Sequence, residues 1–365
     1  MTTGHYQVAD AIVPSVFTGM VLRETREKSE LESSGILQRS GVLDNWMSSE
    51  IGSGGGSWTL NRPTWNDLDA SDATGIERRA DDSPSELYNP DFENGFPVPQ
   101  KITTYNEVAV RTLRNNHWSA IQLANYVGGT TNQDAISVIG SRLGKYWARR
   151  LQKMVLATLT GVFGDNVAND SGDMVHDISG LAGTTFVDGL TNFNASAFYD
   201  ALQTLGDADD QIVGMITHSA VRNSMRKAGL LDSVNDANGR LVYNSYQGMR
   251  LIIDDTMPNA AGVYKSFLFR EGALQYGSVA PEDATEFVRR PEAGNGNGSK
   301  ELWNRVSWCV HPMGFAYTGT ITNTVGGPLN GDASTADTLA HEDSWNRVAP
   351  ERKQVGLIQL ITREA

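Results

Sequence analysis

Residues 131–164 read TNQDAISVIGSRLGKYWARRLQKMVLATLTGVFG and carry the strongest helical pattern in the chain. Side chains suited to a buried surface recur at steps of three and four residues, which places them on one face of an α-helix. They are Ile136, Ile139, Leu143, Trp147, Leu151, Met154 and Thr158. Thr131 or Asn132 can act as the N-cap, and we expect Gly161 and Gly164 to end the helix. At 1.5 Å per residue this helix would be about 45 Å long, longer than most globular helices.

The opposite face of this predicted helix is basic. Arg142, Lys145, Arg149 and Lys153 follow one another at steps of three and four residues, so they stack into a stripe, here called the basic stripe. The chain of 365 residues has a formal net charge of −13, which argues against a general nucleic-acid binder. Three interpretations of the basic stripe stay open: a plain solvated face, contact with acidic groups of another subunit, and contact with nucleic acid.

The segment before the predicted helix is acidic and carries little periodicity. It begins at GSGGGSWTLNRPTW (52–65), and nine acidic residues but only two basic ones, Arg78 and Arg79, lie between Thr64 and Asn94. Loops longer than about 12–15 residues are usually functional or disordered. Trp58, Trp65 and other apolar residues within this segment argue against full disorder, because they need a surface on which to be buried.

The remaining chain predicts a mixed α/β fold with a hydrophobic core. Hydrophobic residues make up 39% of the sequence and charged residues 20%, and no apolar run approaches the length of a membrane span. From residue 190 onward, helical patterns occupy 195–207 and 220–231, the second ending at Gly229. Strand patterns occupy 211–219, 239–258, 264–277, 284–290, 301–319 and 353–364.

The motifs of common enzymes are absent. GSGGGS is followed by neither Gly-Lys-Ser/Thr nor a helix, so it is no phosphate-binding loop. The pairs His218–Ser219 and Cys309–His311 lie at or in strands, and we interpret them as a strand-end cap and as packing. The aspartates between residues 165 and 177 lack the EF-hand spacing, which leaves a loose, adventitious cation site as the functional alternative. We therefore predict no enzyme, no cofactor and no metal centre.

The order of several stretches resembles the major capsid proteins of tailed bacteriophages with the HK97-like fold. They are GSGGGSWTLNRPTWNDLDASD (52–72), KITTYNEVAVRTLRNNHWSAIQLA (101–124), the helix ending YWARRLQKMVLATLTGVFG, MITHSAVRNSMRKAGLL (215–231), GMRLIIDDTMP (248–258), YKSFLFREGAL (264–274), HPMGF (311–315), and WNRV followed by QVGLIQLITRE (345–364). Together they cover essentially the whole chain. No single motif is diagnostic, and the resemblance depends on the ordered set.

The resemblance implies an α+β architecture with named parts. An N-terminal arm would occupy residues 1–47, and an extended hairpin called the E-loop would occupy 48–108 and reach onto a neighbouring subunit. A peripheral domain at 109–189 would contain the long spine helix 131–164. An axial domain would follow at 190–295, and strands at 296–365 would return to the peripheral domain.

The resemblance also implies a set of E-loop residues that contact other subunits. They are Gly54, Gly55, Gly56, Trp58, Pro63, Trp65, Arg78 and Arg79. We interpret the glycines as a flexible root that lets the loop swing, and the tryptophans as anchors on another subunit. Some family members crosslink a lysine of this loop to a neighbouring asparagine. No lysine occurs here between Lys28 and Lys101, which argues against that chemistry.

The implied function is self-assembly. Pentamers and hexamers of the chain would form an icosahedral shell around double-stranded DNA, with weak non-specific contact to the DNA. The implied partners are a portal, a decoration protein, and a separate scaffolding protein, because the arm is too short to hold a scaffolding domain. The chain would be a virion component assembled in the host cytoplasm, with no membrane partner. The alternative is an encapsulin-like compartment shell of the same fold, which would hold cargo enzymes instead of a genome.

Overall fold

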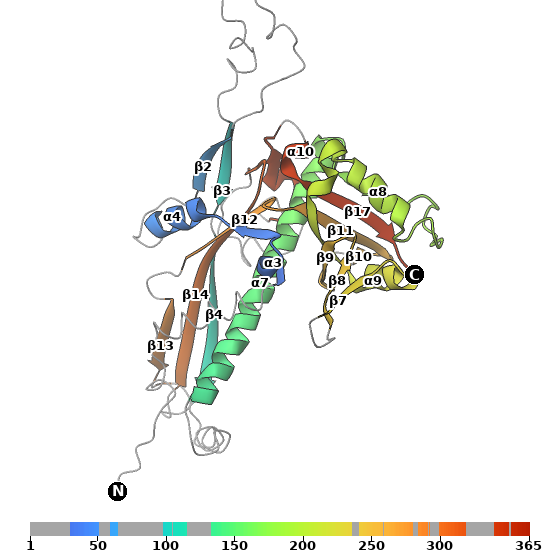
Figure 1. The fold of residues 1–365 in the computed structure, drawn as a ribbon. Coiled ribbons are helices and arrows are strands. Elements are labelled where there is room, and N and C mark those ends of the chain that lie inside the picture. The colour runs from blue at the N-terminus through green and yellow to red at the C-terminus, as the bar shows by residue number, and fades with distance from the viewer. Residues whose placement is uncertain are drawn as a thin grey trace, which may run out of the picture. The chain divides into compact units, whose positions relative to one another are not determined.

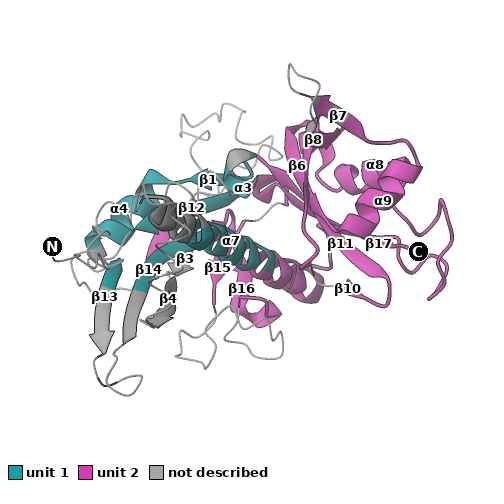
Figure 2. Ribbon diagram, turned by 90° about the horizontal axis from the view of Figure 1, so that it is seen from below, with its two compact units in different colours: residues 1–58, 104–156, 274–310 teal, residues 59–103, 157–273, 311–365 magenta. Residues whose placement is uncertain are grey.

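A computed structural model gives the fold (Figure 1). It describes residues 30–50, 59–64, 98–103, 105–114, 133–235, 241–257, 259–279, 284–290, 292, 299–318, 339–349 and 352–365. The chain divides into two compact units (Figure 2). The first comprises Met1–Trp58, Thr104–Leu156 and Leu274–Val310, and the second comprises Thr59–Thr103, Ala157–Ala273 and His311–Ala365.

The long helix predicted at 131–164 is present as α7, Gln133–Asn169, with 37 residues. It does not end at Gly161 or Gly164, and that expectation was wrong. A Cβ atom at Gly161 would lie 2.2 Å from the carbonyl oxygen of Leu339 and 2.6 Å from the indole ring of Trp345. Glycine is needed there for close packing inside the second unit, so it does not mark a helix end.

The first unit contains a five-stranded sheet. Its order is β1 (Leu37–Arg39), β12 (Leu274–Val279), β14 (Ser299–Pro312) and β13 (Thr285–Arg290), and β4 (Tyr105–Arg114) also pairs with β14. The short helix α3 (Glu30–Ser33) precedes β1, and α4 (Gly41–Glu50) follows it. Leu43 and Met47 of α4 are fully buried, and a Cβ atom at Gly277 of β12 would lie only 2.7 Å from Leu43 Cβ. Because glycine has no Cβ atom, α4 can pack closely against the sheet at this position.

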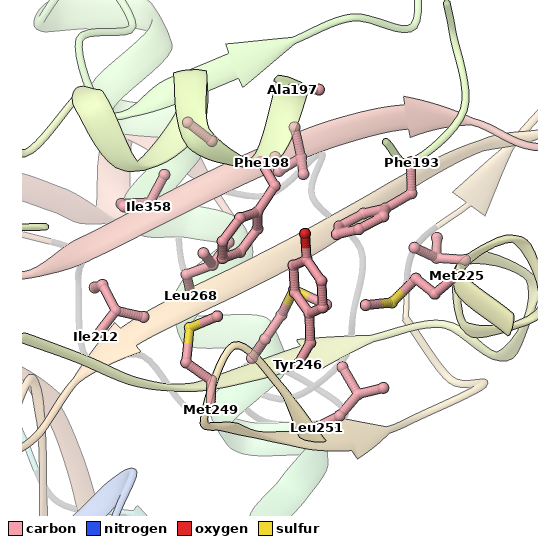
Figure 3. Close-up of a cluster of buried hydrophobic side chains, with 14 of the residues drawn as sticks. Phe193, Ala197, Phe198, Ile212, Met225, Tyr246, Met249, Leu251, Leu268 and Ile358 are labelled. Atoms are coloured by element: carbon pink, nitrogen blue, oxygen red, sulfur yellow. The ribbon is translucent and has the colours of Figure 1, made fainter. Parts of the chain in front are cut away.

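The second unit contains an eight-stranded mixed sheet. Its order is β5 (Val175–Asp177), β17 (Leu357–Arg363), β11 (Val263–Arg270), β6 (Ile212–Thr217), β9 (Met249–Ile253), β8 (Leu241–Tyr246) and β7 (Asp232–Asn235), and β10 (Asn259–Ala260) pairs with β11. Its hydrophobic core includes Phe193, Phe198 and Tyr246, whose rings make edge and tilted contacts (Figure 3). Leu268 of β11 and Ile358 of β17 belong to the same cluster.

Two helices of the second unit begin at side-chain caps. Asn194 accepts a hydrogen bond from the Ala197 amide at the start of α8 (Ala195–Gln203). His218 Nδ1 accepts one from the Ala220 amide at the start of α9 (Ser219–Lys227). The expected end of this second helix near Gly229 agrees with the structure, where Gly229 has φ +68° just beyond α9. Glycine commonly occupies such a left-handed position just after a helix.

Shorter elements complete the second unit. Strands β2 (Thr59–Thr64) and β3 (Val98–Thr103) pair antiparallel, from Thr59 opposite Thr103 to Thr64 opposite Val98. Strands β15 (Phe315–Tyr317) and β16 (Trp345–Arg347) form another antiparallel pair. The 3₁₀ helices are η3 (Gly206–Gln211) and η4 (Glu342–Ser344), and α10 (Arg352–Val355) precedes β17. The pairing of β2 with β3 brings the two ends of segment 65–97 together, as a hairpin requires.

The two units divide the chain differently from the expected domains, whose boundaries stay a prediction. Strands β12 and β13 fall in the range 190–295 but pair within the sheet of β14, in the first unit. Strand β17 was expected among strands returning to 109–189, and it lies between β5 from that range and β11 from 190–295. Five of the seven residues of β17 are buried, as in a strand that is covered on both faces. This burial suits an interior position in the sheet.

Substituting Gly161 by alanine should destabilise the protein although glycine is unfavourable in helices. Alanine would gain about 0.8–1.0 kcal/mol in helix propensity. The new Cβ atom would collide with the Leu339 carbonyl, which accepts a hydrogen bond of 2.8 Å from Trp345 Nε1, and overpacking costs about 1–3 kcal/mol. We expect a lower Tm of unassembled subunits by calorimetry. Gly180→Ala is the control, because no atom lies within 4 Å of its Cβ position; an unchanged or higher Tm for Gly161→Ala would contradict the close-packing role.

Candidate functional site

The rotation of α7 about its axis is fixed by a buried tryptophan. Trp147 is 0% exposed, and its Nε1 donates a hydrogen bond of 2.6 Å to Asn304 Oδ1 on β14. Asn304 Nδ2 in turn donates to the Ala284 carbonyl and the Thr285 hydroxyl. The Trp147 ring also meets the Trp308 ring edge-on, with centroids 5.5 Å apart. Because these contacts require one orientation, the face of α7 that carries Trp147 is turned to the sheet of the first unit.

The basic stripe lies on the exposed side of α7. The side chains of Arg142, Lys145, Arg149 and Lys153 are all exposed. Arg149 Nε donates a hydrogen bond of 3.3 Å to the Lys145 carbonyl, and none of the four makes a salt bridge with another described residue. The structure therefore presents four cationic groups on one helix face and leaves their partner to be identified.

Most of the expected E-loop contact residues lie outside the described residues. These are Gly54, Gly55, Gly56, Trp58, Trp65, Arg78 and Arg79. Pro63 is in strand β2, opposite Pro99 of β3. Proline cannot donate to a ladder hydrogen bond and is confined to strand edges and ends, so this pair is typical of an isolated two-stranded ribbon. The contact role of these residues stays a prediction.

The His218–Ser219 pair forms a helix cap. His218 Nδ1 is engaged by the Ala220 amide, and His218 Nε2 lies 3.7 Å from Asp255 Oδ1. The same Asp255 oxygen accepts a hydrogen bond from the Ser219 amide, and contacts with Ser219 hold the pKa of Asp255 below its usual value. A nucleophilic triad needs the histidine between the carboxylate and the hydroxyl. Here the carboxylate is the central group, which suits capping and not activation of Ser219.

Cys309 and His311 are both buried. Burial raises the pKa of the Cys309 thiol, whereas a nucleophilic cysteine needs a lowered pKa. Burial likewise lowers the pKa of His311 to about 3, so its imidazole is neutral at physiological pH. The arrangement suits packing better than chemistry at either residue.

An arginine occupies the centre of the aspartate-rich run at the end of α7. Arg347 Nη1 lies 2.8 Å from Asp173 Oδ1, and its Nε lies 3.3 Å from Asp170 Oδ2. Among the described residues, no group of three or more acidic, histidine or cysteine side chains could hold a metal ion. The guanidinium is the cation of this cluster, and sequence reasoning missed it. The sequence signal available for it was Arg347 in WNRV (345–348), a basic residue far from this acidic run in sequence.

Sequence reasoning also missed Glu364, a buried carboxylate near the end of the chain. It is 5% exposed, and its Oε1 accepts hydrogen bonds from the Phe193 amide at 3.2 Å and the Thr362 hydroxyl at 2.8 Å. The Ser224 hydroxyl of α9 donates to its Oε2. One side chain therefore ties α9, the segment before α8 and the C-terminal strand together.

No family model matches the sequence. A curated relative, the major capsid protein of Bacillus phage SPP1, is 34% identical over 363 residues, which is 98% of each chain. The chain belongs to the major capsid proteins of tailed bacteriophages. As such it is a component of the virion, and the encapsulin-like alternative becomes the weaker one. No helix in the described part of this capsid protein is long and apolar enough to cross a membrane.

The solved capsid of Ralstonia phage GP4 supports the fold of this capsid protein. A chain of the capsid of Ralstonia phage GP4 matches with a TM-score of 0.50 and 9% identity, covering 93% of this chain and 91% of that chain. A chain of the cyanophage Pam1 capsid has a TM-score of 0.47 and 12% identity, covering 90% and 89%. The fold is HK97-like, as expected from the sequence.

Replacing Asp165 by asparagine should stabilise the capsid protein at neutral pH. Asp165 is 1% exposed, Asn169 donates to its Oδ1 at 2.7 Å, and its Oδ2 has no hydrogen-bond partner within the described part of the chain. Burial raises the pKa of this carboxyl above its ordinary value of 3.8, so the folded state favours the protonated form. That contribution to stability is present below pH 3.8 and is lost as the pH rises through the raised pKa.

We therefore expect the Tm of Asp165→Asn to exceed that of wild type at pH 7, with the difference shrinking toward pH 4 in a series of thermal scans. Asp188→Asn is the matched control, because Asp188 also accepts from an amide four residues away, Asn192, but is exposed. A lower Tm for Asp165→Asn at pH 7 would mean that the ionised carboxylate is a net stabilising group.

Proposed function

We propose that this capsid protein assembles into an icosahedral shell of pentamers and hexamers that encloses double-stranded DNA. The observation that carries the proposal is the 34% identity to a phage major capsid protein over 98% of both chains. The subunit surface agrees, because large apolar side chains remain exposed, among them Leu181 at 60% and Val42 at 55%. Such groups gain most where copies of the chain cover one another.

The net charge of −13 is compatible with a container for DNA. A strongly basic inner surface would bind phosphates tightly and in a salt-dependent way. An acidic subunit holds DNA by enclosure, with weak and non-specific contact. A separate scaffolding protein, a portal and a decoration protein are the further partners that we propose.

We propose that the basic stripe contacts the acidic E-loop segment of a neighbouring subunit. The segment between Thr64 and Asn94 carries nine acidic and two basic residues, and the stripe offers four exposed cations. In this arrangement Trp58 and Trp65 anchor the loop, Gly54 to Gly56 form its flexible root, and Pro63, Arg78 and Arg79 lie along it. A single exposed ion pair contributes only about 0–1 kcal/mol, but a closed shell repeats each contact in every subunit.

Electron microscopy of the purified protein tests the assembly function. We expect closed shells of uniform diameter under conditions that favour assembly, because the contacts needed for the shell belong to the chain itself. A protein that forms no closed particles at any concentration or salt level, with or without its scaffolding protein, would contradict the proposal.

Reversing charge in the basic stripe tests its role. The double variant Arg142→Glu and Arg149→Glu should impair shell formation, because the neighbour's acidic segment would then meet negative charge. Light scattering and microscopy at low and high salt measure the effect, and wild-type assembly should weaken with salt because salt screens exposed pairs.

The matched control is Arg226→Glu with Lys227→Glu, which reverses two exposed charges on α9 outside the stripe. Normal empty shells from the stripe variant at both salt levels would disprove the contact with the acidic segment. If those shells also failed to retain DNA, the stripe would face the DNA instead.

A further inference from the structure

A pocket of about 470 Å³ lies in the second unit between the end of α7 and the sheet. Its floor is one face of three neighbouring strands, because Lys265 of β11 lies opposite Ile361 of β17, and Asp177 of β5 also pairs with Ile361. Gln359 lies on the same face, two residues from Ile361 and opposite Phe267. Phe163 of α7 stacks on Phe267 with centroids 5.4 Å apart, which closes the pocket at its base.

Two hydrogen-bond donors, Lys265 and Gln359, line this pocket. Gln359 is 2% exposed, and its Nε2 has no hydrogen-bond partner among the residues that the structure describes. Lys265 forms no salt bridge with any described residue, and burial lowers the pKa of its amine while Asp177 opposes that shift. Asp177 is exposed, and its Oδ1 accepts a hydrogen bond of 2.8 Å from the Ser179 amide. Unsatisfied buried donors are costly and uncommon in native proteins.

The surroundings of the donors define the group that would satisfy them. Asp177 and Glu342 also line the pocket, so an incoming carboxylate would meet two like charges. A neutral acceptor avoids that repulsion, and the main-chain carbonyl is the commonest one in proteins. Val167, which is 58% exposed, together with Val175 and Ile361 provides an apolar wall beside the donors. The pocket therefore suits peptide carbonyls next to an apolar side chain.

We propose that this pocket binds a short apolar peptide segment of a second copy of this chain, whose main-chain carbonyl oxygens accept hydrogen bonds from Lys265 and Gln359. The inference rests on the proposed shell. In a closed shell, neighbouring copies are held at fixed positions, so their segments face each other at a high effective concentration. The apolar wall and the half-buried Lys265 amine then become covered on assembly, and Gln359 Nε2 gains an acceptor.

Chemical labelling of lysines tests this inference. An amine-reactive acetylating reagent should modify Lys265 in unassembled subunits and fail to modify it in shells assembled from the purified chain alone, as read by mass spectrometry. Dissociating the shells should restore the labelling. Lys227, exposed on α9, reports that the reagent is active in the subunit sample.

Three outcomes of the labelling would overturn the inference. They are equal labelling of Lys265 in shells and subunits, protection already present in unassembled subunits, and protection that appears only in shells containing another protein. In all three the shell itself would still form. The absence of shells from the wild-type chain would count against the proposed function as well, so the two failures are distinguishable.

Variants of the two donors give a second, independent measurement. Gln359→Leu removes the unsatisfied donor and Lys265→Met removes the half-buried amine, and both keep much of the side-chain volume, so unassembled subunits should keep or raise their Tm. Shells of these variants should dissociate at lower denaturant concentration than wild-type shells. Lys227→Met is the matched control for loss of a lysine. Unchanged shell dissociation with normally folded subunits would disprove the role of the donors.

Discussion

The hydrogen bond from Trp147 to Asn304 fixes which side of the longest helix is buried. Both groups are almost fully buried, so losing the bond would leave two polar groups unpaired at about 1–3 kcal/mol each. The bond connects α7 to β14, the strand that carries Asn304. Asn304 also donates to the Ala284 carbonyl and the Thr285 hydroxyl, so the connection extends to the start of β13. Since helix residues at steps of three and four share a face, one fixed rotation determines the exposure of the basic stripe.

A comparable constraint acts in the second unit near the chain end. Glu364 accepts hydrogen bonds from the Phe193 amide and the side chains of Ser224 and Thr362, so one buried carboxylate connects elements far apart in sequence. Strand β17, which immediately precedes it, is buried along most of its length between β5 and β11. The C-terminal residues are therefore integral to this sheet, and truncating them would remove a central strand together with its buried polar contacts.

Periodic patterns were predictable from the sequence, and contacts between distant segments were not. Side chains spaced three and four residues apart predicted the position of α7, because this spacing depends only on helix geometry. The same spacing predicted that the basic stripe would lie on the exposed face. The role of Gly161 could not be recognised, since its reason is the approach of Leu339 and Trp345 from more than a hundred residues away. The ion pairs of Arg347 and the pocket of Lys265 and Gln359 depend equally on strand pairing and register.

The buried polar groups of the second unit fall into two kinds, and the difference bears on assembly. Arg347 has both neighbouring carboxylates within 3.3 Å, so its charge is compensated inside the subunit. Gln359 Nε2 lacks an acceptor among the described residues, and it lies with the half-buried Lys265 beside an exposed apolar wall. Copies with a net charge of −13 repel one another, so association must gain more from apolar burial and from newly formed hydrogen bonds than it loses to repulsion. A subunit that keeps a buried donor unsatisfied until a neighbour arrives gains stability at the moment of contact, and this favours the assembled state over the free subunit.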